Sequence, residues 1–162
     1  MAKSEKQKLK LLYIIQCLME KTDEEHAVTT QEIIDYLALQ GITAERKSIY
    51  TDIDLLTDFG MDIIKKPGRS GGYTLASRQF ELAELKLLVD AVQSSKFITT
   101  KKSRELIGKL ETLCSKYEAT QLHRQVVVTN RNKAVNENIY YNVDIIYNAI
   151  AENVNIKLQY FE

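Results

Sequence analysis

A glycine-rich segment placed directly after an amphipathic stretch constrains the fold of this chain more than any other sequence feature. The apolar pair Ile63-Ile64 is followed by the chain's only proline, Pro67, and by three of its six glycines, before the largely apolar residues 73–75. Short apolar segments on either side of Pro and Gly are typical of two antiparallel strands joined by a long turn. The sequence therefore predicts a β-hairpin, or wing, over residues 63–75.

Two helices with a very short connection are predicted immediately before this hairpin. One begins at Thr29, because the sequence Thr-Thr-Gln-Glu has the form of a capping box, and it ends before Gly41. The next covers residues 44–59, with Thr43 as the expected N-cap. Two amphipathic helices joined so closely bury both apolar faces by crossing at a steep angle, which is the geometry of a helix-turn-helix. With the hairpin, the motif becomes a winged helix-turn-helix.

The apolar residues of these helices repeat at helical spacing, which predicts a shared core. A further amphipathic helix is expected before them, over Lys6–Lys21. The residues expected to face the core are Leu11, Leu12, Ile15, Leu18 and Met19 in the first helix, Ile33, Ile34 and Leu37 in the second, and Ile49, Ile53, Leu55, Leu56 and Phe59 in the third.

The remainder of the chain is predicted to be mainly helical. Apolar residues recur at helical spacing over three ranges, Phe80–Ser95, Lys101–Tyr117 and Val143–Glu152. The residues that the last of these helices is expected to bury are Ile145, Ile146, Ala149 and Ile150. The fold class expected for the chain is therefore mainly α with a small β-hairpin wing.

Three parts follow from this organisation. Residues 1–76 are expected to form a winged helix-turn-helix DNA-binding domain, residues 77–138 a helical linker region that could also dimerise, and residues 139–162 the start of a further domain. Strands are predicted at Val126–Val128 and, from the alternation of Ile156, Leu158 and Tyr160, at the end of the chain. Because a single terminal strand has no partner for its backbone hydrogen bonds, we expect the chain to be a fragment of a longer protein.

The overall charge does not indicate a nucleic-acid partner. The chain has 22 basic and 22 acidic residues, and the part up to Leu75 has 10 basic and 12 acidic ones. A DNA-binding surface must therefore come from the positions of the charges and not from their sum.

A polar face near the start of the third helix is the candidate base-reading surface, because a helix in the major groove reads bases with outward side chains near its N-terminus. The residues expected on that face are Arg46, Lys47, Ser48, Tyr50 and Thr51. The two cations could approach guanine edges or phosphates, the Ser and Thr hydroxyls could bond either, and the tyrosine hydroxyl suits a phosphate oxygen. Asp52 and Asp54 would repel the DNA backbone, so they are expected to point sideways or away. The alternative is an ordinary solvated helix face.

The predicted wing carries three cations on a glycine-rich loop, Lys65, Lys66 and Arg69. Such a loop can lie along the minor groove or the DNA backbone, where cations add affinity by releasing counterions. The alternative is a surface loop that only aids solubility. Lysines also occur at the N-terminus, and we expect a solvated helix start there more than phosphate contacts; these are Lys3, Lys6, Lys8 and Lys10.

Signals for an enzyme are scarce. His26 and His123 stand without Cys or carboxylates at metal-ligand spacing, and Gly68–Gly72 lacks the Lys-Ser/Thr ending of a phosphate-binding loop. No Ser or Cys lies in a recognisable nucleophile motif. We therefore expect no catalytic residues, no metal site and no cofactor.

Two cysteines, Cys17 and Cys114, lie far apart within apolar helical patterns and are expected to be buried thiols of a reducing compartment. No apolar run reaches the roughly 18–20 residues that span a bilayer. The N-terminus also lacks the apolar stretch of a signal peptide. We therefore expect a cytoplasmic protein without a membrane partner.

Residues 43–75, TAERKSIYTDIDLLTDFGMDIIKKPGRSGGYTL, resemble the winged helix that opens transcriptional regulators of the WYL-domain family, close to the DeoR-type helix-turn-helix. That pattern has a Ser or Thr cap, an Arg-x-Ser/Thr-Ile stretch, an Asp-Ile pair, a Leu and a GGY-like wing. The matching residues here are Thr43, Arg46, Ser48, Ile49, Asp52, Ile53, Leu56, Gly71, Gly72 and Tyr73. The family often has Arg before the Asp, whereas this chain has Thr51, so that phosphate contact does not carry over.

The resemblance covers nearly the whole chain. Residues 80–113 are similar to the helical linker of these regulators, and residues 142–162 to the beginning of the WYL domain, whose barrel and Trp-Tyr-Leu region are not in this sequence. The resemblance implies a regulator that binds double-stranded DNA and often forms a homodimer. It also implies an effector, a ligand or nucleic acid, that binds the missing C-terminal domain.

The function expected is therefore sequence-specific DNA binding by a transcriptional regulator such as a repressor, with residues 44–59 in the major groove and the wing on the backbone or minor groove. In one alternative the winged helix is a regulatory appendage of an enzyme, as in biotin ligases that repress their own operon. The helical region after the wing disfavours that, because such ligases need an Arg- and Gly-rich adenylate loop there. In another the winged helix is a protein-interaction module, which exposed apolar residues on the third helix would favour, but polar residues are expected on that side.

Overall fold

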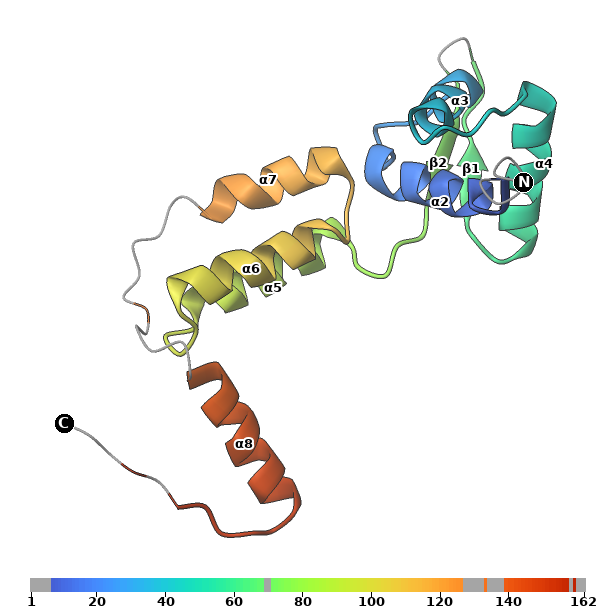
Figure 1. Cartoon of the computed structure of the whole chain (residues 1–162). Coiled ribbons are helices and arrows are strands. Elements are labelled where there is room, and N and C mark those ends of the chain that lie inside the picture. Colours follow the sequence, from blue (N-terminus) through green and yellow to red (C-terminus); the bar gives the residue numbers. More distant parts are fainter. Residues whose placement is uncertain (1–6, 69–70, 127–132, 134–138, 158, 160–162) are drawn as a thin grey trace.

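The computed structural model describes residues 7–68, 71–126, 133, 139–157 and 159 (Figure 1). Within these residues the chain forms helices α2 to α8 and one small antiparallel sheet, so the expected fold class, mainly α with a β-hairpin, is confirmed. The elements of the first group, here called the winged helix, are α2 (Lys10–Lys21), α3 (Thr30–Leu39), α4 (Arg46–Asp58), β1 (Ile63–Lys65) and β2 (Tyr73–Leu75).

The ends of α3 and α4 are set by local sequence signals. The capping box at the start of α3 is confirmed, since the Thr29 hydroxyl accepts from the Glu32 amide at 3.2 Å and the Glu32 carboxylate accepts from the Thr29 amide at 2.7 Å. Gly41 and Gly60 follow α3 and α4 with φ of 72° and 106°, the left-handed conformation that glycine adopts without strain.

The prediction that Thr43 caps α4 is wrong. The N-cap is Glu45, whose side chain makes no capping hydrogen bond. Thr43 still belongs to the turn, where its carbonyl accepts a hydrogen bond from Nε2 of Gln7 at 3.1 Å. The turn between α3 and α4 is thus longer than the sequence pattern indicated.

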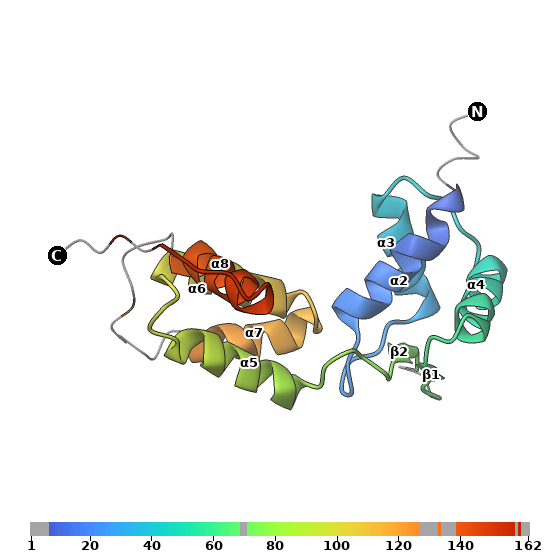
Figure 2. The ribbon, with the colours of Figure 1, turned by 90° about the horizontal axis from the view of Figure 1, so that it is seen from below.

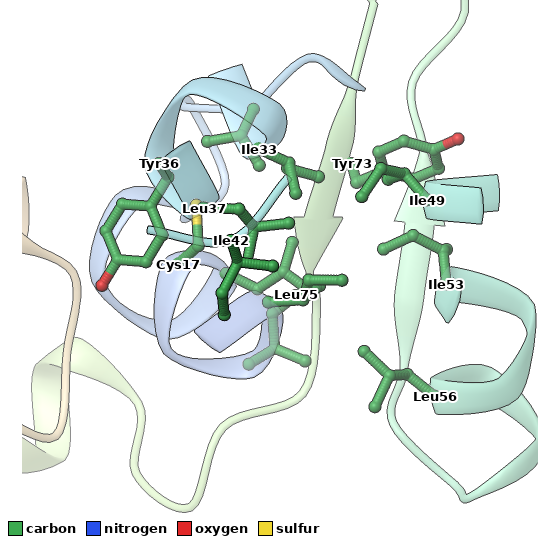
Figure 3. Packing of buried hydrophobic residues seen from close by; sticks show 13 residues of the cluster. Cys17, Ile33, Tyr36, Leu37, Ile42, Ile49, Ile53, Leu56, Tyr73 and Leu75 are labelled. Atoms are coloured by element: carbon green, nitrogen blue, oxygen red, sulfur yellow. The ribbon is translucent and has the colours of Figure 1, made fainter. Parts of the chain in front are cut away.

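The core of the winged helix lies where its helices meet the buried strand β2 (Figure 3). Ile49, Ile53 and Leu56 point from α4 toward Leu75 on one side, and Ile33 and Leu37 of α3 approach from the other. The remaining members of this cluster are Ile14, Cys17, Leu18, Val28, Tyr36, Ile42 and Tyr73.

Some predicted core residues are exposed. Leu55 and Phe59 of α4 are 51% and 82% exposed, and Leu12 and Met19 of α2 are also exposed, so their predicted burial is wrong. The core covers only one side of each helix. On α4 this side is occupied by Ile49, Asp52, Ile53 and Leu56, and on α2 by Ile14, Cys17 and Leu18.

The predicted hairpin is present, and its second strand has one additional backbone partner. Ile63 pairs with Leu75 and Lys65 pairs with Tyr73. Tyr73 also exchanges two backbone hydrogen bonds with Val28, at 3.0 and 2.8 Å. A β-carbon added at Gly72 would lie 2.4 Å from the carbonyl oxygen of Val28, so a glycine is required where β2 approaches this residue.

The second group, here called the helical group, consists of α5 (Leu82–Ser94), α6 (Thr100–Glu111) and α7 (Lys116–Val126). These helices pack on one another around Leu85, Val89, Ile107, Cys114 and Leu122. The views in Figures 1 and 2 agree in placing the start of α7 beside α2, and α2 and α7 are in contact.

The single helix predicted over Lys101–Tyr117 is two helices. The chain leaves α6 at Glu111, and a further capping box starts α7. The Ser115 hydroxyl accepts from the Glu118 amide at 3.1 Å, and the Glu118 carboxylate accepts from the Ser115 amide at 3.0 Å. The strand predicted at 126–128 is also wrong at Val126, which ends α7, while residues 127–128 lie outside the described residues.

The last described helix is α8 (Ile139–Ala151), close to the predicted range. Ala149 is buried as expected, but Ile145 and Ile150 are 56% and 67% exposed, so their predicted burial is wrong. Residues 154–157 form no strand and pair with neither β1 nor β2, so the strand predicted there is wrong within the described residues; Leu158 and Tyr160 lie outside that part. Within the described residues, no helix combines the length and apolarity needed to cross a membrane.

Both cysteines are free and buried, as predicted. Cys17 belongs to the core of the winged helix and Cys114 to that of the helical group. Burial, which disfavours the thiolate, raises the pKa of each thiol to about 11.

Candidate nucleic-acid interface

The polar side of α4 faces outward, as the sequence predicted. Its apolar side is fixed in the core by Ile49, Ile53 and Leu56. The residues exposed on its first two turns are Arg46, Lys47, Tyr50 and Thr51. In Figure 2 the helix runs along the outer edge of the winged helix, away from the helical group. These four side chains are therefore accessible on the side of α4 that faces away from the helical group.

Hydrogen bonds at the start of α4 order part of this surface. Nη2 of Arg46 lies 3.4 Å from Oε1 of Gln31, near the start of α3, which holds the guanidinium between the two helices. The hydroxyls of Ser48 and Thr51 donate to carbonyls of their own turn, at 3.0 and 3.3 Å, and the Ser48 hydroxyl also accepts a hydrogen bond from Nζ of Lys10 at 3.4 Å. Ser48 is half-buried and is the least accessible of the five predicted residues.

The first predicted aspartate is neutralised behind the surface. Asp52 is buried, and its carboxylate forms an ion pair with Lys10 of α2 at 2.6 Å, so it is turned away from the exposed side of α4, as expected. Lys10 is thereby occupied by an internal partner and its side chain is only 14% exposed, so the expectation of a solvated helix start is wrong at this lysine. The pair also joins α2 to α4.

The second predicted aspartate lies on the exposed side. At about 100° per residue, Asp54 and Asp58 fall on the same face of α4 as Lys47 and Thr51, and both are exposed. The expectation that Asp54 points sideways or away is therefore wrong. The face is cationic and polar in its first two turns and acidic in its last two, so only the N-terminal half suits a phosphate-lined groove.

The wing contributes one cation to the same surface. Lys65 of β1 is exposed, and its Nζ lies 5.8 Å from the centroid of the Tyr50 ring, which brings the wing next to α4. Lys66 is half-buried, and its Nζ donates to the carbonyl of Glu24, so it is turned toward the loop before α3. Arg69 lies outside the described residues.

The two histidines have carboxylate partners that the sequence reasoning did not identify. Nδ1 of His123 lies 3.1 Å from Glu111, and Nδ1 of His26 lies 2.7 Å from Oδ1 of Asp23. Asp23 also accepts a hydrogen bond from the Ser115 hydroxyl at 2.6 Å. No local motif signals this last contact, because the two residues are 92 positions apart.

The Ser115, Asp23 and His26 trio does not have the order of a hydrolase triad, in which histidine lies between the other two. Here the carboxylate is in the middle and the serine is fully buried. Burial acts to raise the pKa of Asp23, but hydrogen bonds from Ser115 and His26 outweigh it and hold this pKa below its usual range. The trio is suited to structural support. Within the described part of the chain, no group of three or more His, Cys, Asp or Glu residues could hold a metal ion.

The best candidate site is thus the N-terminal half of α4 together with Lys65 of the wing. Four of the five predicted α4 residues lie on it exposed, and of the three predicted wing cations the structure places Lys65 there. Comparisons of the chain with protein-family models, curated proteins and solved structures gave no match.

Proposed function

We propose that this protein is a sequence-specific DNA-binding transcriptional regulator whose helix α4 enters the major groove. The observation that carries the proposal is the cationic and polar first half of α4, held outward by a core behind it and flanked by a hairpin. An α-helix is about 10–12 Å wide, and the major groove of B-DNA is about 12 Å wide. The width of α4 therefore suits the groove.

The distribution of charge sets the direction of approach. Lys47 and Thr51 lie on the outermost line of α4, with Arg46 and Tyr50 beside them, so these side chains would meet base edges and phosphates first. Asp54 and Asp58 follow on the same face and would be repelled by phosphates. The helix is therefore proposed to enter with its N-terminus inward, and Lys65 to contact the backbone nearby.

Further parts of the proposal rest on the resemblance to WYL-domain regulators. They are membership of that family, a homodimer, a cytoplasmic location and an effector that binds a further C-terminal domain. The exposed apolar side chains Leu87 and Phe97 in the helical group, 70% and 68% exposed, are compatible with a second copy packing there. The buried free thiols are compatible with a reducing compartment.

A second candidate function is favoured by one observation. Leu55 and Phe59 give the last part of α4 an exposed apolar surface, which a protein-interaction module would use. The two functions use different halves of the same helix, so substitutions separate them. Replacement of Leu55 and Phe59 by Ser should leave DNA affinity unchanged if DNA is the ligand of the first half.

The experiment that tests the proposal is selection of bound duplexes from a random pool, followed by affinity measurements at several salt concentrations. The double substitution Arg46→Ala and Lys47→Ala should weaken binding by about 1–3 kcal/mol for each bidentate hydrogen-bond pair to a base that it removes. The matched control is Arg104→Ala with Lys109→Ala, which removes the same charge from exposed positions of α6. Equal affinity of the two double variants would refute a role for α4 in DNA binding.

A further inference from the structure

The loop between α2 and α3, residues 22–28, is attached to the wing at three points. The Thr22 hydroxyl accepts a hydrogen bond from the Leu75 amide at 3.1 Å, and Val28 pairs with Tyr73 through two backbone bonds. Between them, the Lys66 ammonium donates to the carbonyl of Glu24. The position of both wing strands therefore depends on the conformation of this loop.

The same loop is attached to the start of α7 in the helical group. Oδ2 of Asp23 accepts from the Ser115 hydroxyl at 2.6 Å, and both side chains are buried. The ring of His26 stacks on that of Tyr117, with centroids 3.6 Å apart and planes 8° apart. Residues from the two groups are thus joined by a hydrogen bond to a carboxylate and by an aromatic stack.

Asp23 connects these two sets of contacts within one side chain. Its other oxygen, Oδ1, accepts from the backbone amides of Glu25 and His26 at 3.0 and 2.8 Å and from the His26 ring. A carboxylate that is deprived of a buried donor moves to recover one, because an unsatisfied buried charge is costly. Removal of the Ser115 hydrogen bond would therefore also disturb the turn that Oδ1 holds.

Open space beside the loop means that the wing and α7 are not packed directly on each other at this point. A cavity of about 740 Å³ is lined by Ile64 and Lys66 of the hairpin region, by Arg78 and Phe80, and by Tyr117 and Gln121 of α7. Across this space, the α2–α3 loop provides the polar contacts described above. The linker after β2 adds a further contact, because Arg78 donates to the carbonyls of Met19 and Thr22.

We propose that Asp23 and Ser115 form a joint through which the helical group holds the wing in its DNA-contacting position. The two residues are positioning residues, since they lie behind the proposed interface. A displacement of α7 would withdraw Ser115 from Asp23 and would loosen the loop and the wing together. This inference rests on the proposed function for its DNA readout, but its first readout needs no DNA.

A matched pair of variants tests the joint. Ser115 is also the N-cap of α7, and Asn and Asp both cap helices well, so Ser115→Asn and Ser115→Asp preserve that role and have nearly the same volume. The Asn amide can donate to Asp23, whereas the Asp carboxylate repels it. A difference between the two variants therefore reports the joint and not the cap or the packing.

The first measurement is residue-resolved hydrogen exchange without DNA. The amides of Tyr73 and Leu75, which bond to the loop, should exchange about tenfold or more faster in Ser115→Asp than in Ser115→Asn, because local opening controls their protection. The Lys66 amide, which bonds to Gly72 within the hairpin, is an internal reference. Equal protection of Tyr73 and Leu75 in the two variants would overturn the joint. If Ser115→Asp does not fold, Ser115→Gly, which removes the donor to Asp23 while glycine still serves at an N-cap, is compared with Ser115→Asn by the same criterion.

The second measurement is affinity for the selected duplex. Ser115→Asp should bind several-fold more weakly than Ser115→Asn, although neither residue is part of the proposed interface. If the exchange difference appears while the unsubstituted protein binds no duplex, the proposed function fails and the joint stands. If the protein binds duplex and both variants bind equally, the joint has no role in positioning the wing for DNA.

Discussion

In the winged helix, polar contacts join several pairs of elements that are far apart in the sequence, whereas in the helical group the helices meet mainly through apolar side chains and the polar contacts of longest sequence range come from Lys133. Gln7 contacts Thr43, Lys10 pairs with Asp52, and Thr22 bonds Leu75, all in addition to a cluster of 13 buried residues. The described cluster of the helical group has five buried residues. Directional contacts fix orientation more sharply than packing does. We therefore expect the helices and strands of the winged helix to hold more sharply defined relative orientations than the helices of the helical group.

The strongest test of this comparison removes a core side chain from each region. Leu37→Ala in the winged helix and Leu85→Ala in the helical group both truncate fully buried leucines, so each should cost about 2–5 kcal/mol of local stability. Leu37→Ala should abolish DNA binding, because it loosens the support of α4, whereas Leu85→Ala should weaken it only several-fold, through the Asp23–Ser115 contact. Denaturant titration combined with hydrogen exchange would show which group opens. If Leu85→Ala exposes the winged-helix amides as much as its own, the two regions form one cooperative unit and the comparison fails.

Replacement of glycine by alanine should destabilise the protein at one position and stabilise it at another. Gly72→Ala places a methyl group 2.4 Å from the Val28 carbonyl oxygen, and overpacking of this kind typically costs about 1–3 kcal/mol. Gly108→Ala in α6 meets nothing within 4 Å and should stabilise the helical group by about 0.5–1 kcal/mol. Thermal unfolding monitored by circular dichroism measures both. A neutral Gly72→Ala would show that β2 can move away from Val28 at little cost.

Acid should weaken the contact between the two regions. Hydrogen bonds hold the pKa of Asp23 below its usual value despite burial, so its contribution to stability is fully present above the unfolded pKa of about 3.9. That contribution is lost as the pH falls from there through the lower folded pKa. The free energy of unfolding, measured from pH 6 downward, should thus decline less in Asp23→Asn than in the unsubstituted protein. Parallel curves would contradict the role given to this carboxylate.

The smallest expected effect is a difference in reaction rate between the two thiols, one of which lies in each core. The pKa of about 11 for Cys17 and Cys114 leaves little thiolate at pH 8, so both should react slowly with a disulfide reagent. Cys114 belongs to the smaller cluster and should react a few-fold faster than Cys17, because reaction follows local opening. The variants Cys17→Ala and Cys114→Ala isolate each rate. In denaturant the two rates should converge.

Much of the winged helix was predictable because its signals are local. The capping box at Thr29, the glycine after α3 and the hairpin all depend on residues close in sequence. The outward face of α4 followed from the spacing of Ile49, Ile53 and Leu56. The turn of Lys66 toward Glu24 was not predictable, because the two residues meet only after the wing closes on the loop.

The errors in the second half have two different physical origins. Ser115 and Glu118 carry the same capping signal as Thr29 and Glu32, but apolar residues on both sides appeared to continue one helix. The exposure of Ile145 and Ile150 has another cause. Periodicity shows which side of a helix is apolar, whereas burial also requires a neighbouring element to cover that side.

The acidic second half of α4 limits how much sequence information one copy could collect. With Asp54 and Asp58 on the line of approach, about two turns of helix remain for base contacts, enough for roughly three or four side chains and a few base pairs. A site that short recurs by chance throughout any genome, where non-specific competitors number about 10⁶–10⁹. If the protein is the regulator proposed here, recognition of a unique promoter therefore requires two copies bound to two half-sites. The spacing of the half-sites is then set by the way in which the two copies are held together.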